Sequence, residues 1–225
     1  TFLFDNKPCE EIIIQNLGPD GVIFEEDFES VTLDQEDGLF SFDMPYGWTT
    51  IDADGDLATW VTIGDGLNGG NCATSASWKN KGLTPDNFLI TPELYGAMRV
   101  TFYACAQDKK VVGDHFAVCA SSTGREKDDF TIVQEWTTGE EAAPAPGAHR
   151  LDQGEWKLYD VSLPAGTKYI AFRHFNTTDK FRINIDDVKV YGDLTGVSHV
   201  STEAPARSGI YTLSGVKLQG KLKDL

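Results

Sequence analysis

The sequence predicts an all-β fold, an antiparallel two-sheet jelly-roll β-sandwich. No window of a dozen residues keeps the apolar spacing of an amphipathic helix without a Gly, Pro or β-branched interruption. Nine short runs instead have the composition of strands, and Gly, Pro, Asn and Asp separate them. Strands do not alternate with helical segments, so nothing indicates a parallel sheet with crossover helices. Many short strands with turn residues between them are typical of a sandwich.

The expected strands follow one another along most of the chain. Residues 98–105 alternate most regularly, with one face formed by Met98, Val100, Phe102 and Ala104. The other expected strands cover residues 21–28, 58–63, 86–92, 115–121, 131–137, 156–163, 168–175 and 181–191. A jelly roll commonly places its first and last strands side by side. The runs 21–28 and 181–191 are therefore expected to be neighbours.

Composition divides the chain into an N-terminal extension (1–20), a jelly-roll domain (21–193) and a linker with the start of a truncated C-terminal segment (194–225). Within the domain, the Ala-, Pro- and Gly-rich run 137–156 is expected to be an exposed, mobile loop. The end of the chain, "GIYTLSGVKLQGKL", has the pattern of a hairpin but is too short to hold a core alone.

The charge of the chain restricts its partners. The 225 residues carry 19 basic and 35 acidic side chains, a formal net charge of -16. Such a balance repels phosphate backbones and anionic membrane surfaces, so neither nucleic acid nor a membrane is an expected partner, whereas divalent cations are favoured. No run approaches the ~20 apolar residues that cross a bilayer. The sequence begins at Thr1 without a signal peptide, which suggests a mature or trimmed chain.

The first motif is "IDADGDLATW", which places Asp52, Asp54 and Asp56 at alternate positions. These are the first three ligand positions of an EF-hand loop, but such a loop also needs Gly at position six and a bidentate acid at position twelve. Leu57 and Ile63 stand there, so an EF-hand is excluded. Two interpretations remain: a solvated Asp/Gly turn, or a carboxylate-rich loop that holds Ca²⁺ with backbone carbonyls and remote acids.

The second motif is a pair of acidic groups at the two ends of the expected domain. Asp27 and Glu29 follow the first strand, and Asp186 and Asp187 interrupt the apolar alternation of the last one. Adjacent acids in a buried strand are costly unless something compensates them. If the two strands are neighbours, these carboxylates converge on one hard cation, and we favour Ca²⁺. The alternative is that they are surface charges that protect sheet edges from aggregation.

The enzymatic motifs HExxH and GxSxG and the P-loop are missing, and no βαβ unit provides the setting of a dinucleotide-binding GxGxxG motif. A glycosidase with a carboxylate pair is a further, less favoured hypothesis, because acidic domains offer such pairs without function. The four cysteines show no CxxC spacing, and we expect Cys105 and Cys119 to be buried free thiols, with a disulfide as the alternative. Trp60 and Trp78 are weak candidates for a ligand platform; core packing is the favoured role of each tryptophan.

Several phrases together resemble the cleaved adhesin domain family of gingipains and related surface haemagglutinins. They are "GWTTIDADGD" followed by Trp60, "PDNFLITPEL", "TFYACAQD", "DHFAVCASSTG" and "LPAGTKYIAFRHFNTTDKFRINIDDVKV". The resemblance covers roughly residues 23–192. It implies a calcium-binding jelly-roll adhesion module, secreted from or displayed on a bacterial surface, that is not catalytic and binds host surface or matrix proteins or glycans.

The resemblance also implies which residues hold calcium. Asp27, Glu29, Asp186 and Asp187 would form one site, and Asp52, Asp54 and Asp56 a second. Loops of the family commonly read "DADGDG", whereas this chain has Leu57 at the place of the last glycine. The alternative function is a carbohydrate-binding module attached to, or acting with, a secreted hydrolase.

Overall fold

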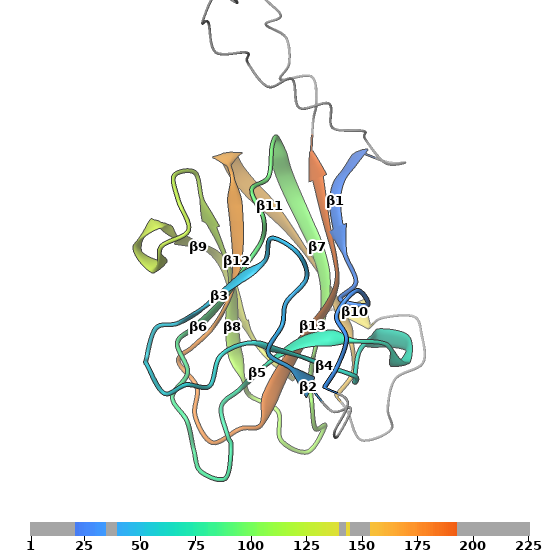
Figure 1. Cartoon of the computed structure of the whole chain (residues 1–225), viewed down its shortest axis with the longest axis vertical. Helices are drawn as coiled ribbons and strands as arrows, with labels where there is room; N and C mark the ends of the chain where they lie inside the picture. The colour runs from blue at the N-terminus through green and yellow to red at the C-terminus, as the bar shows by residue number, and fades with distance from the viewer. Residues whose placement is uncertain (1–20, 35–39, 140–142, 145–153, 193–225) are drawn as a thin grey trace, which may run out of the picture. The chain divides into compact units, whose positions relative to one another are not determined.

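The computed structural model describes residues 21–34, 40–139, 143–144 and 154–192. These residues form two antiparallel β-sheets, so the structure confirms the predicted jelly-roll β-sandwich (Figure 1). The described helices are two 3₁₀ turns, η2 (Leu67–Gly69) and η3 (Lys127–Asp129). No helix in this part of the chain is long and apolar enough to cross a membrane. The predicted extension 1–20 and the segment 193–225 lie outside the described residues.

The larger sheet has eight strands. Its order is β10 (Ala143–Pro144), β11 (Lys157–Thr167), β7 (Ala97–Ala106), β13 (Arg182–Gly192), β5 (Cys72–Ala76), β4 (Val61–Ile63) and β2 (Phe40–Ser41). The eighth strand, β1 (Val22–Glu26), also pairs with β13. The first and last strands of the domain are therefore neighbours, as the sequence predicts.

The smaller sheet has five strands. Its order is β3 (Thr49–Asp52), β6 (Asn87–Ile90), β12 (Tyr169–His174), β8 (His115–Ser121) and β9 (Thr131–Thr137). The main core lies between the sheets. From the larger sheet Phe102 reaches Phe172 of the smaller one, with ring centroids 4.9 Å apart. Removing each such ring from water contributes about 1.5–3 kcal/mol to folding.

One end of β7 departs from the predicted alternation. Val100, Phe102 and Ala104 are buried as expected, but Met98 is 57% exposed and Ala97 is buried in its place. The pairing of β7 with both neighbouring strands is irregular at this end, near Thr167 of β11 and Gly192 of β13. A register irregularity of this kind reverses which face a side chain occupies. The predicted alternation, which places Met98 on one face with Val100, Phe102 and Ala104, therefore fails at Met98.

β13 exchanges partners along its length and thereby positions the acidic pair. Arg182 to Ile185 pair with β5, and Val188 to Tyr191 pair with β1. Asp186 and Asp187 lie between these two stretches, where the pairing with β7 also shifts register. Asp187 has a φ of 47°, the left-handed conformation that aspartate tolerates better than most residues. The acids therefore sit at a β-bulge.

The predictions for single residues have mixed outcomes. Cys105 and Cys119 are buried free thiols, as expected, and so is Cys72; Cys9 lies outside the described residues.

Most of the predicted exposed loop 137–156 also lies outside the described residues. Its last residue, Trp156, is fully buried, so the prediction of exposure is wrong at that point. Trp156 packs in a small apolar cluster with Cys72 and Cys105 on the outer side of the larger sheet.

Candidate metal centre

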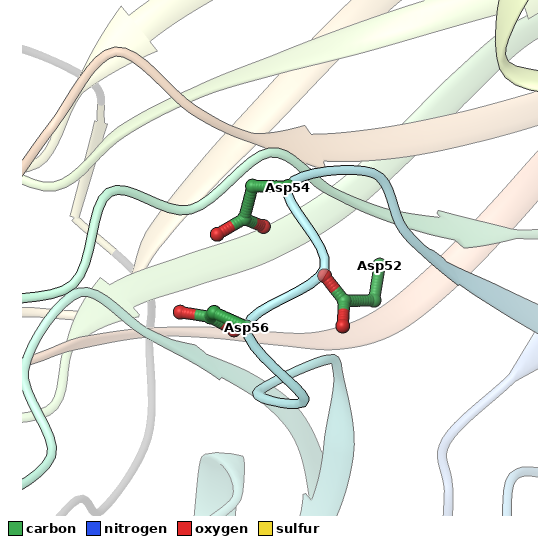
Figure 2. A group of neighbouring side chains, drawn as sticks. All are labelled: Asp52, Asp54 and Asp56. Carbon is green, nitrogen blue, oxygen red and sulfur yellow. The ribbon is translucent and has the colours of Figure 1, made fainter.

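The loop that follows β3 brings Asp52, Asp54 and Asp56 together (Figure 2). Asp52 organises the loop, because its Oδ1 accepts the backbone N–H of Gly55 at 2.7 Å and its Oδ2 accepts that of Leu57 at 2.8 Å. The chain can fold back so tightly because Gly55 and Leu57 both have positive φ angles, 75° and 66°. The alternating aspartates thus lie on a closed turn.

The geometry of these three carboxylates suits a calcium ion. Each residue offers one ligand oxygen, and these oxygens all lie within 4.8 Å of one another. Calcium–oxygen distances are about 2.3–2.6 Å, so two ligands on opposite sides of one ion are at most about 5 Å apart. Among the described residues, no other group of three acidic, histidine or cysteine ligands meets this distance. The cluster predicted from the spacing is therefore present.

Electrostatics also favour a cation in this loop. Partial burial raises the pKa of Asp54, and repulsion from Asp56 raises it further. The backbone N–H of Asp86, which Asp54 Oδ1 accepts at 3.1 Å, offsets part of this rise. A divalent ion between the carboxylates would remove the repulsion.

Sequence reasoning did not identify Asp86 as a neighbour of this loop. Its carboxylate binds the Arg173 guanidinium through two contacts, Nε to Oδ1 at 2.6 Å and Nη2 to Oδ2 at 3.0 Å. Such a two-point ion pair holds Asp86 in place and neutralises it. The two residues are 87 positions apart, so no local pattern could have revealed the contact.

The other four predicted ligands separate into two groups. Asp186 is buried and faces the turn 66–71: its Oδ2 accepts the backbone N–H of Leu67 at 2.7 Å. Glu29 faces the same turn, and its Oε1 accepts the N–H of Asn71 at 2.7 Å. A Cβ added at Gly70 would lie 1.7 Å from that Glu29 oxygen, so a larger residue there would force the Glu29 side chain to move. The glycine-rich run "GDGLNGGN" was the signal for this turn, and it was missed.

Burial and repulsion act together on Asp186. Desolvation raises its pKa to about 8, and the negative charges of Asp187 and Glu29 contribute to the rise. Its two hydrogen bonds from backbone N–H groups, those of Leu67 and Asp187, only partly oppose the effect. A buried carboxylate among other acids is the environment in which a bound cation stabilises the charged form.

Asp187 lies on the other side of the bulge. It lines a groove of about 220 Å³ with Glu25, Asp27 and Lys189. Burial raises its pKa, Lys189 lowers it, and repulsion from Asp27 and Glu25 raises it. The structure thus pairs Asp186 with Glu29 and Asp187 with Asp27, in two neighbouring groups. The four carboxylates do not form one compact cluster of the kind made by the triple-aspartate loop.

The two candidate tryptophans lie in different environments. Trp60 is fully buried, and its Nε1 donates to the Asn87 carbonyl oxygen at 3.2 Å. The suggestion of Trp60 as a ligand platform is wrong, because a buried indole presents no face to a ligand. Trp78 is 38% exposed and packs against Phe181, with ring centroids 6.3 Å apart.

The comparison with protein families decides the classification. The sequence profile of the Cleaved Adhesin Domain matches residues 36–190, more than half of the chain. The chain belongs to the cleaved adhesin domain family. It is therefore an adhesin-type module, as the resemblance of its sequence phrases predicted.

Two curated proteins of Porphyromonas gingivalis contain related cleaved adhesin domains. Hemagglutinin A is 43% identical over 189 residues, which cover 74% of this chain and 7% of that protein. Gingipain R1 is 40% identical over 185 residues, which cover 74% of this chain and 11% of that protein. The match thus spans only a small part of either relative.

Two solved cleaved adhesin domains share the fold. The K1 domain of Lys-gingipain from Porphyromonas gingivalis W83 superposes with a TM-score of 0.63 at 39% identity, covering 76% of this chain and 98% of that structure. The K2 domain of Lys-gingipain gives a TM-score of 0.62 at 37% identity, with coverages of 76% and 98%. Almost the whole of each of these domains is therefore matched by this chain.

Proposed function

We propose that this cleaved adhesin domain is a calcium-stabilised extracellular module that binds a host protein or glycan and catalyses no reaction. The observation that carries the proposal is the triple-aspartate loop, whose three carboxylates lie within 4.8 Å of one another. Calcium is a hard cation that prefers oxygen ligands in flexible geometry, and this loop supplies carboxylates from one short turn.

The residues of this loop fit calcium on chemical grounds. Backbone N–H groups fix the carboxylates of Asp52 and Asp56, and each carboxylate has further lone pairs for a metal. Asp54 and Asp56 are exposed, so an ion can enter from solvent. Bound calcium would neutralise the repulsion between these acids. The residues themselves hold the turn closed and tie it to β6 through the N–H of Asp86.

A second calcium position is supported less directly. Asp186 is a buried carboxylate whose charge no described lysine or arginine side chain pairs with directly, and Glu29 contacts the same turn. Burial and the nearby charges of Asp187 and Glu29 raise the pKa of Asp186, and a bound cation would stabilise its charged form. Asp27 and Asp187 offer oxygen ligands on the neighbouring side of the bulge.

The proposed absence of catalysis is supported by the burial of a hydrogen-bonded serine, histidine and aspartate network. This is the one such network among the described residues. His174 contacts Ser75 Oγ through Nδ1 at 2.8 Å and Asp114 Oδ1 through Nε2 at 3.1 Å. His174 and Asp114 are fully buried, and Ser75 is nearly so. A substrate cannot reach this network, so its role is to join strands within the core.

An extracellular location is supported by the relatives, whose names are hemagglutinin and gingipain. An adhesion role suits a module whose strands form a rigid scaffold and whose connecting loops present the contact surface. Screening the chain against host matrix proteins and a glycan array would separate protein adhesion from the carbohydrate-binding alternative. Signal confined to glycans would favour the latter.

The decisive experiment is a thermal melt of the 225-residue chain in EGTA and across a Ca²⁺ titration, with Mg²⁺ as control. A ligand that binds only the folded state stabilises it by RT ln(1 + [L]/Kd), about 2.7 kcal/mol at a hundred times Kd. The melting temperature should therefore rise with Ca²⁺ and much less with Mg²⁺. An unchanged melting temperature across the titration would refute calcium stabilisation.

Variants assign the ion to its ligands. The double change Asp54→Asn and Asp56→Asn should remove the calcium-dependent shift contributed by the triple-aspartate loop. The matched control is Asp128→Asn with Asp160→Asn, which alters the net charge equally at exposed positions away from the loop. If both double variants lost the shift alike, calcium would be acting on the overall charge and not on this loop.

A further inference from the structure

One end of the sandwich concentrates positive charge in a chain whose net charge is -16. Two connections contribute, residues 77–86 between β5 and β6 and residues 175–181 between β12 and β13. Their acids are Asp179 and Asp86, and Asp86 forms an ion pair with Arg173. The basic residues of this end are Lys79, Lys81, Lys180 and, at the start of β13, Arg182. The local balance is therefore opposite to that of the whole chain.

Hydrogen bonds hold the two connections side by side. The N–H of Ser77 donates to the Phe181 carbonyl oxygen at 3.0 Å, and the N–H of Asp179 donates to the Ser77 carbonyl oxygen at 3.1 Å. The hydroxyl of Thr177 donates to the Gly113 carbonyl oxygen at 3.2 Å, which adds the connection between β7 and β8. Figure 1 shows these three connections at the same end of the sheets, at the bottom of the view.

The lysines of this end are available to a ligand. Lys79, Lys81 and Lys180 are exposed, and none of their ammonium groups forms an ion pair with a residue that the structure describes. The stem of Lys180 lies over Gly113: a Cβ added at that glycine would be 2.9 Å from the lysine Cε. This glycine therefore lets Lys180 lie across the surface, close to the hollow described next.

A hollow of about 700 Å³ adjoins Lys180. Its wall includes hydroxyl and amide groups from Thr84, Asn176, Thr177 and Thr178, the ammonium group of Lys180, and the ion pair of Asp86 with Arg173. Phe175 also contributes to the lining, but it is only 5% exposed. Protein partners are usually anchored by apolar and aromatic side chains in dry pockets. Hydroxyl and amide groups suit the hydroxyls of a sugar, and unpaired ammonium groups suit sulfate.

We propose that Lys79, Lys81 and Lys180, with the adjoining hollow, form a binding surface for a sulfated polysaccharide. The inference names a ligand class for the adhesion role proposed above and rests on that role. It explains why a chain with a large negative charge keeps three exposed lysines at one end without an ion pair to a described residue. The excess negative charge elsewhere would orient an anionic chain toward this end.

The test measures binding of the 225-residue chain to heparin and to chondroitin sulfate. Desulfated heparin, which keeps the uronic acid carboxylates but has no sulfate, is the matched probe. Lys79→Gln with Lys180→Gln should weaken binding to the sulfated chains by about tenfold or more at low salt. The matched control is Lys127→Gln with Lys168→Gln, exposed lysines near the opposite ends of β8 and β12. The control should bind as the parent chain does, and binding should fall as salt increases.

Three results would overturn the proposal. They are equal binding of desulfated heparin, an equal loss in both double variants, and equally tight binding of duplex DNA or polyglutamate, which would indicate attraction to any polyanion. The calcium titration reads the proposed function separately. If calcium stabilised the chain but no sulfate-dependent binding were found, only the polysaccharide surface would be refuted. If binding depended on the lysines but calcium did not stabilise the chain, calcium would be removed from the proposed function and the polysaccharide surface would stand.

Discussion

The carboxylate of Asp186 on β13 accepts the backbone N–H of Leu67, in the turn between β4 and β5, at 2.7 Å. Burial raises the pKa of this carboxyl from 3.8 to about 8. In the absence of metal and at a pH between these two pKa values, Asp186 is protonated in the folded chain and ionised in the unfolded chain. The free energy of unfolding therefore falls as the pH rises from about 4 to about 8.

Asp186→Asn should flatten this pH dependence. In EGTA, the parent chain is expected to lose at least about 1 kcal/mol of stability between pH 5 and pH 8 relative to the variant, because asparagine has no charge to bury. Urea unfolding at several pH values measures the difference. Asp160→Asn, an exposed control, should leave the slope unchanged. Parallel pH profiles for parent and Asp186→Asn would contradict the assignment.

Leu57→Gly should stabilise the triple-aspartate loop. Leu57 has a φ of 66° and is 87% exposed, so the leucine side chain adds strain and little packing. Relief of a left-handed conformation is worth about 1–2 kcal/mol, and the added flexibility of glycine in the unfolded chain offsets about half of it. Thermal melts in EGTA should show a gain of about 0.5–1 kcal/mol. Leu57→Ala keeps the Cβ and should show no gain; equal gains in both would exclude backbone strain as the cause.

Phe102→Ala should destabilise the sandwich by about 3–5 kcal/mol. The ring is fully buried and stacks on Tyr159, with centroids 5.2 Å apart, while its edge meets Phe172 of the other sheet. Its removal leaves a cavity between the sheets. Met98→Ala, four residues earlier on the same strand, is the control and should cost well under 1 kcal/mol because Met98 is exposed. Urea denaturation of both variants tests the orientation of β7.

The described thiols should resist labelling in the folded chain. Burial raises the pKa of Cys119 to about 12 and the pKa values of Cys72 and Cys105 well above the ordinary value, so little thiolate forms at neutral pH. A Cys9→Ser chain treated with a thiol reagent at pH 8 should react only in guanidinium, where all three thiols become accessible. Reaction of any thiol in the native chain at the rate of free cysteine would contradict this burial.

The sequence predicted the fold well because strand alternation and turn residues are local signals. The jelly-roll topology correctly predicted that the first and last strands pair. The alternate spacing of Asp52, Asp54 and Asp56 correctly predicted that their carboxylates lie close together. These features depend on residues that are close in sequence or on rules that apply to a whole fold class.

The features that were missed depend on contacts between distant segments. The bulge that separates Asp186 from Asp187 arises where β13 exchanges β5 for β1, which the alternation of one strand does not encode. The same holds for the ion pair of Asp86 with Arg173 and for the exposure of Met98. For Trp60 the favoured prediction of core packing is confirmed, because the side chain is fully buried and donates to the Asn87 carbonyl oxygen; only the weaker suggestion of a ligand platform fails.

The pairing of β1 with β13 also determines how the domain responds to mechanical force. Val22 of the first strand lies opposite Tyr191 of the last, so the chain enters and leaves the domain at the same point. Tension applied through these two ends pulls antiparallel partners apart at their open end and loads their hydrogen bonds one after another. β1 would therefore peel from β13 at low force and open the ladder toward Glu26, next to Asp27 and the acidic bulge. A cation that bridges the two strands at that point would act as the stop that limits the peeling.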